Sequence, residues 1–334
     1  MARFARCIVH AGSHKTGTTT VQRMMAAQRA PLAASGVHYP ALDREDRDHN
    51  PLAHRLATCG DDDLVLARAQ LAAHAGDAHT LLLSAEEFST RIGNPHPWAG
   101  FDDGAYWEHR RQYLQRLRQV LADAERIEVY LCFRDHESYA HALYATKIVS
   151  GQIDWDFAQF VSRCAPIFDY RRQVEVLEQT LGPVRVVGWE QLRGDLANRF
   201  FAWLEVPIRT GHAPRIRPTP TLDLIHWLAR TAPAQVGGDE FKRRAAFCRE
   251  HRGPPGAAQA AVPSLWPTPQ ARQDFLRLCH APPLEGWPPM AAAGPVADIA
   301  ALDRRADEIE AEYRQWLRAP GGLRKHWWAF WRRR

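Results

Sequence analysis

The chain has 334 residues, of which 46% are hydrophobic and 24% are charged, a composition typical of a globular protein with a sizeable core. No apolar run approaches the roughly 20 residues of a membrane-spanning helix, and the apolar stretch in the N-terminal MARFARCIVHAG is too short for a signal peptide, so we expect a cytoplasmic protein. The formal charge of +5 favours anionic ligands, but basic and acidic residues alternate along most of the chain, which argues against nucleic acid as a partner.

The cysteines predict neither a disulfide framework nor a metal site. They are scattered, they form no C-x-x-C pair, and no Cys/His cluster has zinc spacing. We therefore expect reduced cysteines that serve in packing, and no metal cofactor.

Four runs of β-branched and apolar residues predict buried strands, at residues 7–11, 80–84, 127–133 and 184–189. Helical patterns lie between these runs, and one of them, DYRRQVEVLEQTLG, ends in a glycine stop at Gly182. Strands that alternate with helices predict an α/β core, residues 1–206, in which a central parallel sheet is covered on both faces.

The residues after position 206 have a different character. Prolines become frequent between short helical pieces, so residues 207–334 are predicted to form an α-helical, proline-rich cap on the core. A stripe of apolar residues predicts an amphipathic helix near the end, formed by Ile299, Leu302, Ile309, Tyr313 and Trp316. The final RKHWWAFWRRR either packs on the body of the protein or makes peripheral contact with an anionic membrane surface.

The segment CIVHAGSHKTGTTT, at residues 7–20, is typical of a phosphate-binding turn. A strand that enters a glycine turn and then a helix directs backbone N–H groups and the positive end of the helix dipole at one point. Only four of the 43 basic residues are lysine, so a lysine inside this turn indicates a specific role. In the nucleotide triphosphatase motif G-x-x-x-x-G-K-[ST] the lysine follows the second glycine, whereas Lys15 precedes Gly17, which disfavours hydrolysis of ATP or GTP.

The order K-T-G-T-T after a short strand resembles the 5'-phosphosulfate loop of sulfotransferases that use 3'-phosphoadenosine 5'-phosphosulfate (PAPS), in particular their bacterial branch. The resemblance extends over roughly residues 7–230 and implies a three-layer P-loop-like fold. It implies that Lys15 contacts the 5'-phosphate and the bridging oxygen of the leaving group. The cofactor-binding loop would comprise Gly12, Ser13, His14, Lys15, Thr16, Gly17, Thr18 and Thr19.

The same resemblance implies a second site, for the 3'-phosphate. Arg134 follows the predicted strand 127–133, where the family has an arginine whose planar fork suits phosphate. The family's serine about two helical turns later is replaced here by Ala142, and Ser138 or His141 on the same helix could partly substitute for it.

Transfer to a hydroxyl group requires a base. Glu86 is the first candidate because it follows the strand 80–84, at the carboxyl edge of the sheet where α/β folds bind ligands. His49 and His54 are the alternatives, since histidine titrates near neutral pH.

The sequence thus predicts a PAPS-dependent sulfotransferase without a metal. We expect it to act on a hydroxyl-bearing acceptor, a sugar or glycan first and a lipid or small molecule second. Two alternatives stay open: a kinase-like nucleotide-binding enzyme, and a non-catalytic protein that binds 3',5'-diphosphoadenosine or a sulfated glycan.

Overall fold

The computed structural model describes residues 3–42, 48–93, 103–206, 220–231, 238–251, 264–279 and 298–318. The chain forms two compact units. The first comprises residues 1–139, 163–216 and 278–290, and the second comprises residues 140–162, 217–277 and 291–334. Residues 140–162, which the sequence pattern assigns to the N-terminal core, therefore cluster with the C-terminal segments.

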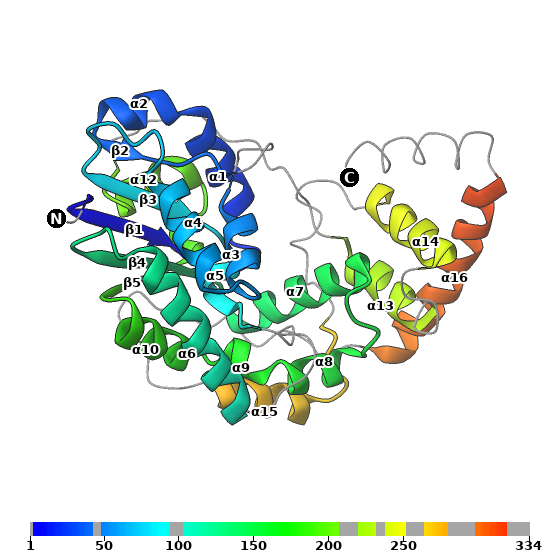
Figure 1. Cartoon of the computed structure of the whole chain (residues 1–334). Helices are drawn as coiled ribbons and strands as arrows, with labels where there is room; N and C mark the ends of the chain where they lie inside the picture. Colours follow the sequence, from blue (N-terminus) through cyan, green and yellow to red (C-terminus); the bar gives the residue numbers. More distant parts are fainter. Residues whose placement is uncertain are drawn as a thin grey trace. The chain divides into compact units, whose positions relative to one another are not determined.

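In the described part of the first unit, five strands form one parallel sheet in the order β2-β3-β1-β4-β5 (Figure 1). The strands are β1 (Arg6–His10), β2 (Val37–His38), β3 (Thr80–Ser84), β4 (Ile127–Phe133) and β5 (Val184–Gly188). This confirms the predicted α/β fold with a central parallel sheet. The four predicted strands are present to within one residue, and β2 is a short strand that the sequence analysis did not predict.

Helices connect these strands. Those of the first unit are α1 (Thr18–Ala27), α2 (Arg29–Ala34), α3 (Asn50–Leu56), α4 (Asp61–Ala72), α5 (Glu87–Thr90), α6 (Asp103–Val120), α9 (Ala165–Phe168), α10 (Tyr170–Thr180), α11 (Trp189–Leu192) and α12 (Leu196–Trp203). Helix α7 (His136–Ser150) begins in the first unit, and most of its residues belong to the second. Asp169 is the N-cap of α10, and its carboxylate accepts the N–H of Arg172 at 3.0 Å; the helix ends at Thr180, shortly before the predicted stop at Gly182.

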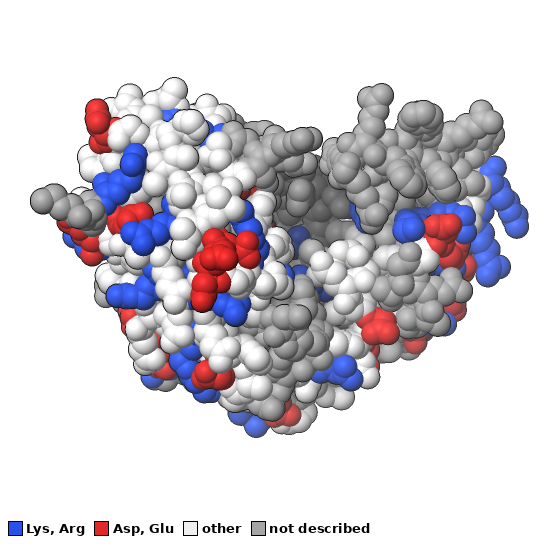
Figure 2. Space-filling view, viewed as in Figure 1, with Lys and Arg blue, Asp and Glu red and all other residues white. Residues whose placement is uncertain are grey.

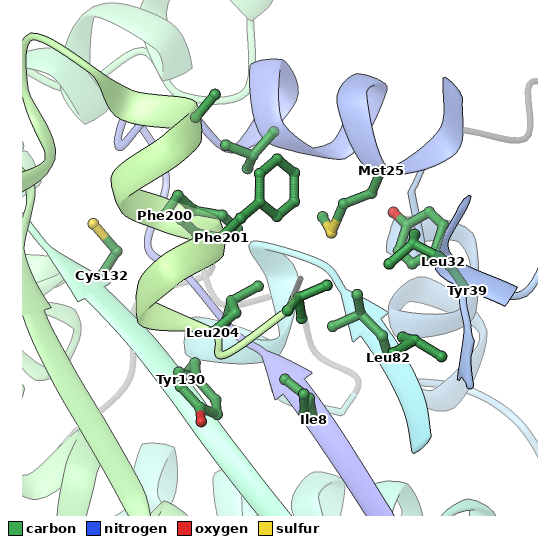
Figure 3. Close-up of a cluster of buried hydrophobic side chains, with 14 of the residues drawn as sticks. Ile8, Met25, Leu32, Tyr39, Leu82, Tyr130, Cys132, Phe200, Phe201 and Leu204 are labelled. Atoms are coloured by element: carbon green, nitrogen blue, oxygen red, sulfur yellow. The ribbon is translucent and has the colours of Figure 1, made fainter. Parts of the chain in front are cut away.

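The sheet has helices on both faces, which makes the three layers. Helices α6 and α10 lie on one face, with α10 packed against β4 and β5 (Figure 1). On the other face, α1 and α12 cover a core of buried apolar side chains (Figure 3). This core includes Ile8, Met25, Leu82, Tyr130, Phe200, Phe201 and Leu204. Because side chains alternate along a strand, Ile8 and His10 face α12 while Cys7 and Val9 face the opposite layer.

The described part of the second unit is helical. Its helices are α8 (Phe157–Arg163), α13 (Leu222–Thr231), α14 (Asp239–Glu250), α15 (Pro269–Cys279) and α16 (Ile299–Arg318), with most of α7. The predicted amphipathic helix is confirmed as α16, which buries Leu302, Ile309 and Tyr313, although Ile299 is exposed. None of the helices that the structure describes is long and apolar enough to span a bilayer.

All six cysteines fall within the described residues, and none of them is joined in a disulfide. Five of them are buried, and burial raises the pKa of the Cys7 and Cys132 thiols. These cysteines are packing residues of the core.

Candidate functional site

The candidate site lies at the carboxyl edge of the sheet, in the first unit. Strand β1 is central, and the chain leaves it between β3 on one side and β4 on the other. In a parallel sheet the strand order reverses at such a point, and the loops that diverge there leave a crevice for ligands. The segments that follow β1, β3 and β4 carry the loop of residues 11–17, Glu86 and Arg134.

The loop is fastened to β4 by its own backbone and hydroxyl groups. The N–H of Ala11 donates to the carbonyl of Tyr130 at 3.0 Å. Both the N–H and the hydroxyl of Ser13 donate to the carbonyl of Cys132, at 3.2 and 2.8 Å, and the Thr16 hydroxyl donates to the Ser13 carbonyl at 2.6 Å. The hydroxyls of Ser13 and Thr16 are buried and fix the loop, so their expected roles as ligand donors stay predictions.

Two residues of the loop have left-handed backbone. Lys15 has φ 68° and Gly17 has φ 78°, and a Cβ at Gly17 would lie 2.6 Å from Cδ2 of Leu196. Gly17 is the N-cap of α1 and has no side chain to satisfy the N–H groups of the first turn, which include those of Thr18 and Thr19. A lysine held in this uncommon conformation costs about 1 kcal/mol or more, and such strain clusters at functional sites.

Sequence reasoning missed His10, which lies beneath the loop. Its ring is buried, its Nδ1 is 2.8 Å from the Ser84 hydroxyl, and its edge packs against the ring of Phe200. A Cβ at Gly12 would lie 2.4 Å from Nε2 of His10, so any larger residue there would force the ring or the loop to shift. Burial lowers the pKa of His10 to about 4, although the nearby Glu86 acts to raise it. The imidazole is therefore neutral at neutral pH. A histidine in a run of apolar residues was the only signal in the sequence.

The structure brings Arg134 and Ser138 together. Nε of Arg134 donates to the Ser138 hydroxyl at 2.9 Å, and the Tyr170 hydroxyl donates to the Arg134 carbonyl at 2.9 Å. The Asp135 carboxylate accepts the N–H of Ser138 at 3.0 Å, which caps the start of α7. Ala142 is buried further along the same helix.

Glu86 follows β3 and is half-buried. Nε2 of Gln22, on α1, donates to its Oε2 at 3.0 Å. Burial acts to raise the pKa of Glu86, but the nearby His14 and hydrogen bonds from Gln22 and Asn50 outweigh it, so the pKa lies below its usual range. Glu86 is therefore ionised at neutral pH and can accept a proton.

Further polar side chains surround Glu86. Nε2 of His14 lies 3.8 Å from Oε1 of Glu87, so this residue of the loop reaches the segment after β3. His54 lies at the end of α3 and is exposed to solvent on one side. Partial desolvation of its ring lowers its pKa; Arg91 adds to this effect and Glu87 opposes it. His54 is thus an accessible neutral imidazole near Glu87.

His49 has a different environment. It is fully buried, its Nδ1 accepts the N–H of Ser84 at 2.8 Å, and its Nε2 lies 3.0 Å from the carbonyl of Pro40, to which it donates. Both ring nitrogens are thus engaged by backbone groups. A role for His49 as base stays a prediction, and this geometry favours Glu86 and His54 over it.

Arg110, on α6, was also missed by sequence reasoning. Its guanidinium is fully buried and donates to the carbonyls of Phe88 and Arg91, the latter at 2.7 Å. These carbonyls belong to α5 and the residue that ends it, so Arg110 holds the segment that begins at Glu86.

Charge is mixed on the surface. In Figure 2, basic and acidic side chains are interspersed over the described surface that the view shows. Among the described residues, no group of three or more His, Cys, Asp or Glu side chains is placed to hold a metal ion.

Comparisons with known proteins add little to this geometry. No family model and no curated protein matches the chain. Among solved structures, the chain is similar to the crystal structure of a sulfotransferase from Alicyclobacillus acidocaldarius, with 17% sequence identity and a TM-score of 0.36. The match covers 64% of this chain and 85% of that one. We therefore base the function on the residues of the site.

Proposed function

We propose that this protein transfers the sulfuryl group of PAPS to a hydroxyl group of an acceptor, a carbohydrate or glycan-type metabolite in the first instance. One observation carries the proposal. The K-T-G-T-T loop leaves the central strand β1, while the paired Arg134 and Ser138 follow the neighbouring strand β4 at the same edge of the sheet. Two anion-binding elements at one switch point suit a ligand with two separate phosphate positions.

The residues present fit such a ligand. When bound, PAPS supplies an activated sulfur that is joined through a bridging oxygen to the 5'-phosphate. The first turn of α1 holds no acidic residue, and its N–H groups and Lys15 would bind the phosphosulfate. Arg134 would bind the 3'-phosphate through its planar guanidinium, and Ser138 would join it by turning its hydroxyl from the Asp135 carbonyl, to which it donates at 3.1 Å, toward the ligand.

Glu86 is the base that we propose. Its carboxylate would take the proton of the acceptor hydroxyl while the hydroxyl oxygen bonds to sulfur and the bond from sulfur to the bridging oxygen breaks. As the new bond forms, the hydroxyl proton becomes more acidic, so a carboxylate with a lowered pKa suffices. Lys15 would offset the charge that develops on the leaving phosphate oxygen.

We place the protein in the cytoplasm, without a metal or nucleic acid in its function. Reduced, buried cysteines suit that compartment. The C-terminal segment RKHWWAFWRRR lies outside the described residues, so membrane contact through it stays a prediction.

Two measurements test the proposal. Calorimetry should show tighter binding of 3',5'-diphosphoadenosine than of ATP; the reverse preference would indicate a kinase-like enzyme. Labelled sulfate should pass from PAPS to an acceptor in a panel of sugars, lipids and small alcohols, and binding without any transfer would indicate a non-catalytic protein.

Three variants identify the base. Glu86→Gln keeps the size of the side chain and removes its basicity, so turnover should fall by ~10²–10⁴ while 3',5'-diphosphoadenosine still binds. His54→Ala and His49→Ala should retain most of their turnover per folded molecule. If His54→Ala abolishes turnover and Glu86→Gln does not, the base is His54.

A further inference from the structure

Gln22 is a buried polar residue on the apolar side of α1. It lies one turn after Thr18 and shares the buried face of the helix with Thr18 and Met25. Its side chain is 2% exposed, in a position where an apolar residue would ordinarily pack. Nε2 of Gln22 lies 3.4 Å from the Ser84 carbonyl and 3.0 Å from Oε2 of Glu86, so both contacts reach the segment at the end of β3.

We infer that Gln22 is a positioning residue that ties the helix of the phosphate loop to the carboxylate of Glu86 and so fixes the separation between the donor site and the base. This inference rests on the proposed function, because it takes Lys15 and Glu86 as the two ends of the reaction. It assigns Gln22 no contact with substrate.

The physical reason is the geometry that in-line transfer requires. The acceptor oxygen must approach sulfur on the side opposite the leaving oxygen while its proton faces the base, and a misplacement of about 1 Å can cost 10²-fold in rate. Helix α1 starts at Thr18, directly after the loop, with Gly17 as its N-cap, so the end of the loop is continuous with the helix that carries Gln22. Glu86 lies on a separate segment, and the amide of Gln22 joins the two.

The contact between His10 and Ser84 joins the two strands that precede these elements. His10 ends β1, Ser84 ends β3, and their side chains are 2.8 Å apart below the loop. His10 thus links β1 to β3 at the sheet edge, and Gln22 links α1 to the end of β3 and the segment that follows it. Loss of Gln22 should thus loosen Glu86, which keeps its hydrogen bond from Asn50, without dissolving the loop.

The charged and titratable groups around Glu86 define what the loss of Gln22 would change. Glu86 interacts electrostatically with His14 in the loop, His10 at the end of β1 and His54 on α3, and Asn50 on α3 donates a hydrogen bond to it. Gln22 stabilises the ionised carboxylate by donating to it. Without this hydrogen bond the pKa of Glu86 rises, and the acid limb of the turnover profile moves to higher pH.

The test compares Gln22→Met with a matched control, Gln173→Met. Gln173 is also 2% exposed, and its Nε2 donates to the Tyr106 hydroxyl at 3.1 Å and to the Pro166 carbonyl at 3.4 Å, not to Glu86. Three quantities are measured for each variant and for the wild type: binding of 3',5'-diphosphoadenosine by calorimetry, kcat against pH with the best sugar acceptor, and the titration of the Glu86 carboxyl carbon by ¹³C NMR. The Glu86 signal is assigned by its loss in Glu86→Gln.

Gln22→Met should bind the diphosphate within threefold of the wild type, lose ~10–100-fold in kcat, and shift both the acid limb and the carboxyl titration to higher pH. Gln173→Met should shift neither. An unchanged titration, or equal effects of the two variants, would overturn the inference. If the wild-type protein transfers no sulfate at all, the proposed function fails, and the NMR titration still decides whether Gln22 holds Glu86.

Discussion

Substitution of Gly12 by alanine tests the packing beneath the loop. The added Cβ would lie 2.4 Å from Nε2 of His10, about 1 Å closer than an ordinary contact. The ring has little freedom to retreat, because it is fully buried, its Nδ1 contacts Ser84 and its edge meets Phe200. Overpacking of this kind lowers the free energy of unfolding by ~1–3 kcal/mol. Because the loop must also shift, 3',5'-diphosphoadenosine should bind at least ~10-fold more weakly, which is ~1.4 kcal/mol.

Urea unfolding and calorimetry measure the two effects. Gly93→Ala is the control: its Cβ would lie 3.6 Å from the Ala57 carbonyl, an ordinary contact, so stability should change by less than ~1 kcal/mol. In a His10→Ala background, Gly12→Ala should cost ~0.5 kcal/mol or less, because the obstructing ring is gone. If Gly12→Ala is as mild as Gly93→Ala in the wild-type background, the close contact between Gly12 and His10 does not exist.

Three further predictions concern the loop, the 3'-phosphate and acid stability. Lys15→Gly should lower turnover by ~10²–10³. It should not lower stability, since glycine relieves the backbone strain of a residue with φ 68°. The control is His74→Gly, which relieves the same strain at an exposed residue with φ 58° and should leave turnover unchanged. Arg134→Ala should weaken binding of 3',5'-diphosphoadenosine and spare AMP in calorimetry; equal losses would place the arginine elsewhere. The pKa of His10 is about 4 in the folded protein, below that of an unfolded histidine. The free energy of unfolding should therefore fall by ~3 kcal/mol as the pH falls from 6.5 to 4. In urea titrations, His10→Gln should make the free energy of unfolding depend less on pH over this range.

The sequence predicted most of the sheet because β1, β3 and β4 are buried on both faces. Such strands are nearly continuous apolar runs, with Glu128 as an exception inside β4, and their bounds follow from the polar residues that flank them. Strand β2 has only two residues, too few for any pattern to show. The grouping of residues 140–162 with the C-terminal segments was also hidden, because it depends on contacts between distant parts of the chain.

Site residues were predictable where a strand end placed them. Lys15, Glu86 and Arg134 each follow a predicted strand, and parallel strands bring such residues to one edge. Gln22 and His10 were missed because their partners lie 62 to 74 positions away in the sequence. His49 could be named as a candidate, but only the fold shows that its two ring nitrogens are bound by the backbone of Ser84 and Pro40.

The placement of buried polar groups supports the site independently of the K-T-G-T-T motif. His10, Gln22 and Ser84 all occupy core positions at the carboxyl edge of the sheet. Buried hydrogen-bonded groups add little net stability, and replacing both partners by apolar residues of similar shape can be nearly neutral or stabilising. Stability of the fold alone therefore does not explain why His10, Gln22 and Ser84 cluster near the loop and the carboxylate of Glu86. Their position is explained if the edge must hold Lys15 and Glu86 at a fixed separation, since hydrogen bonds fix direction and distance as apolar contacts do not.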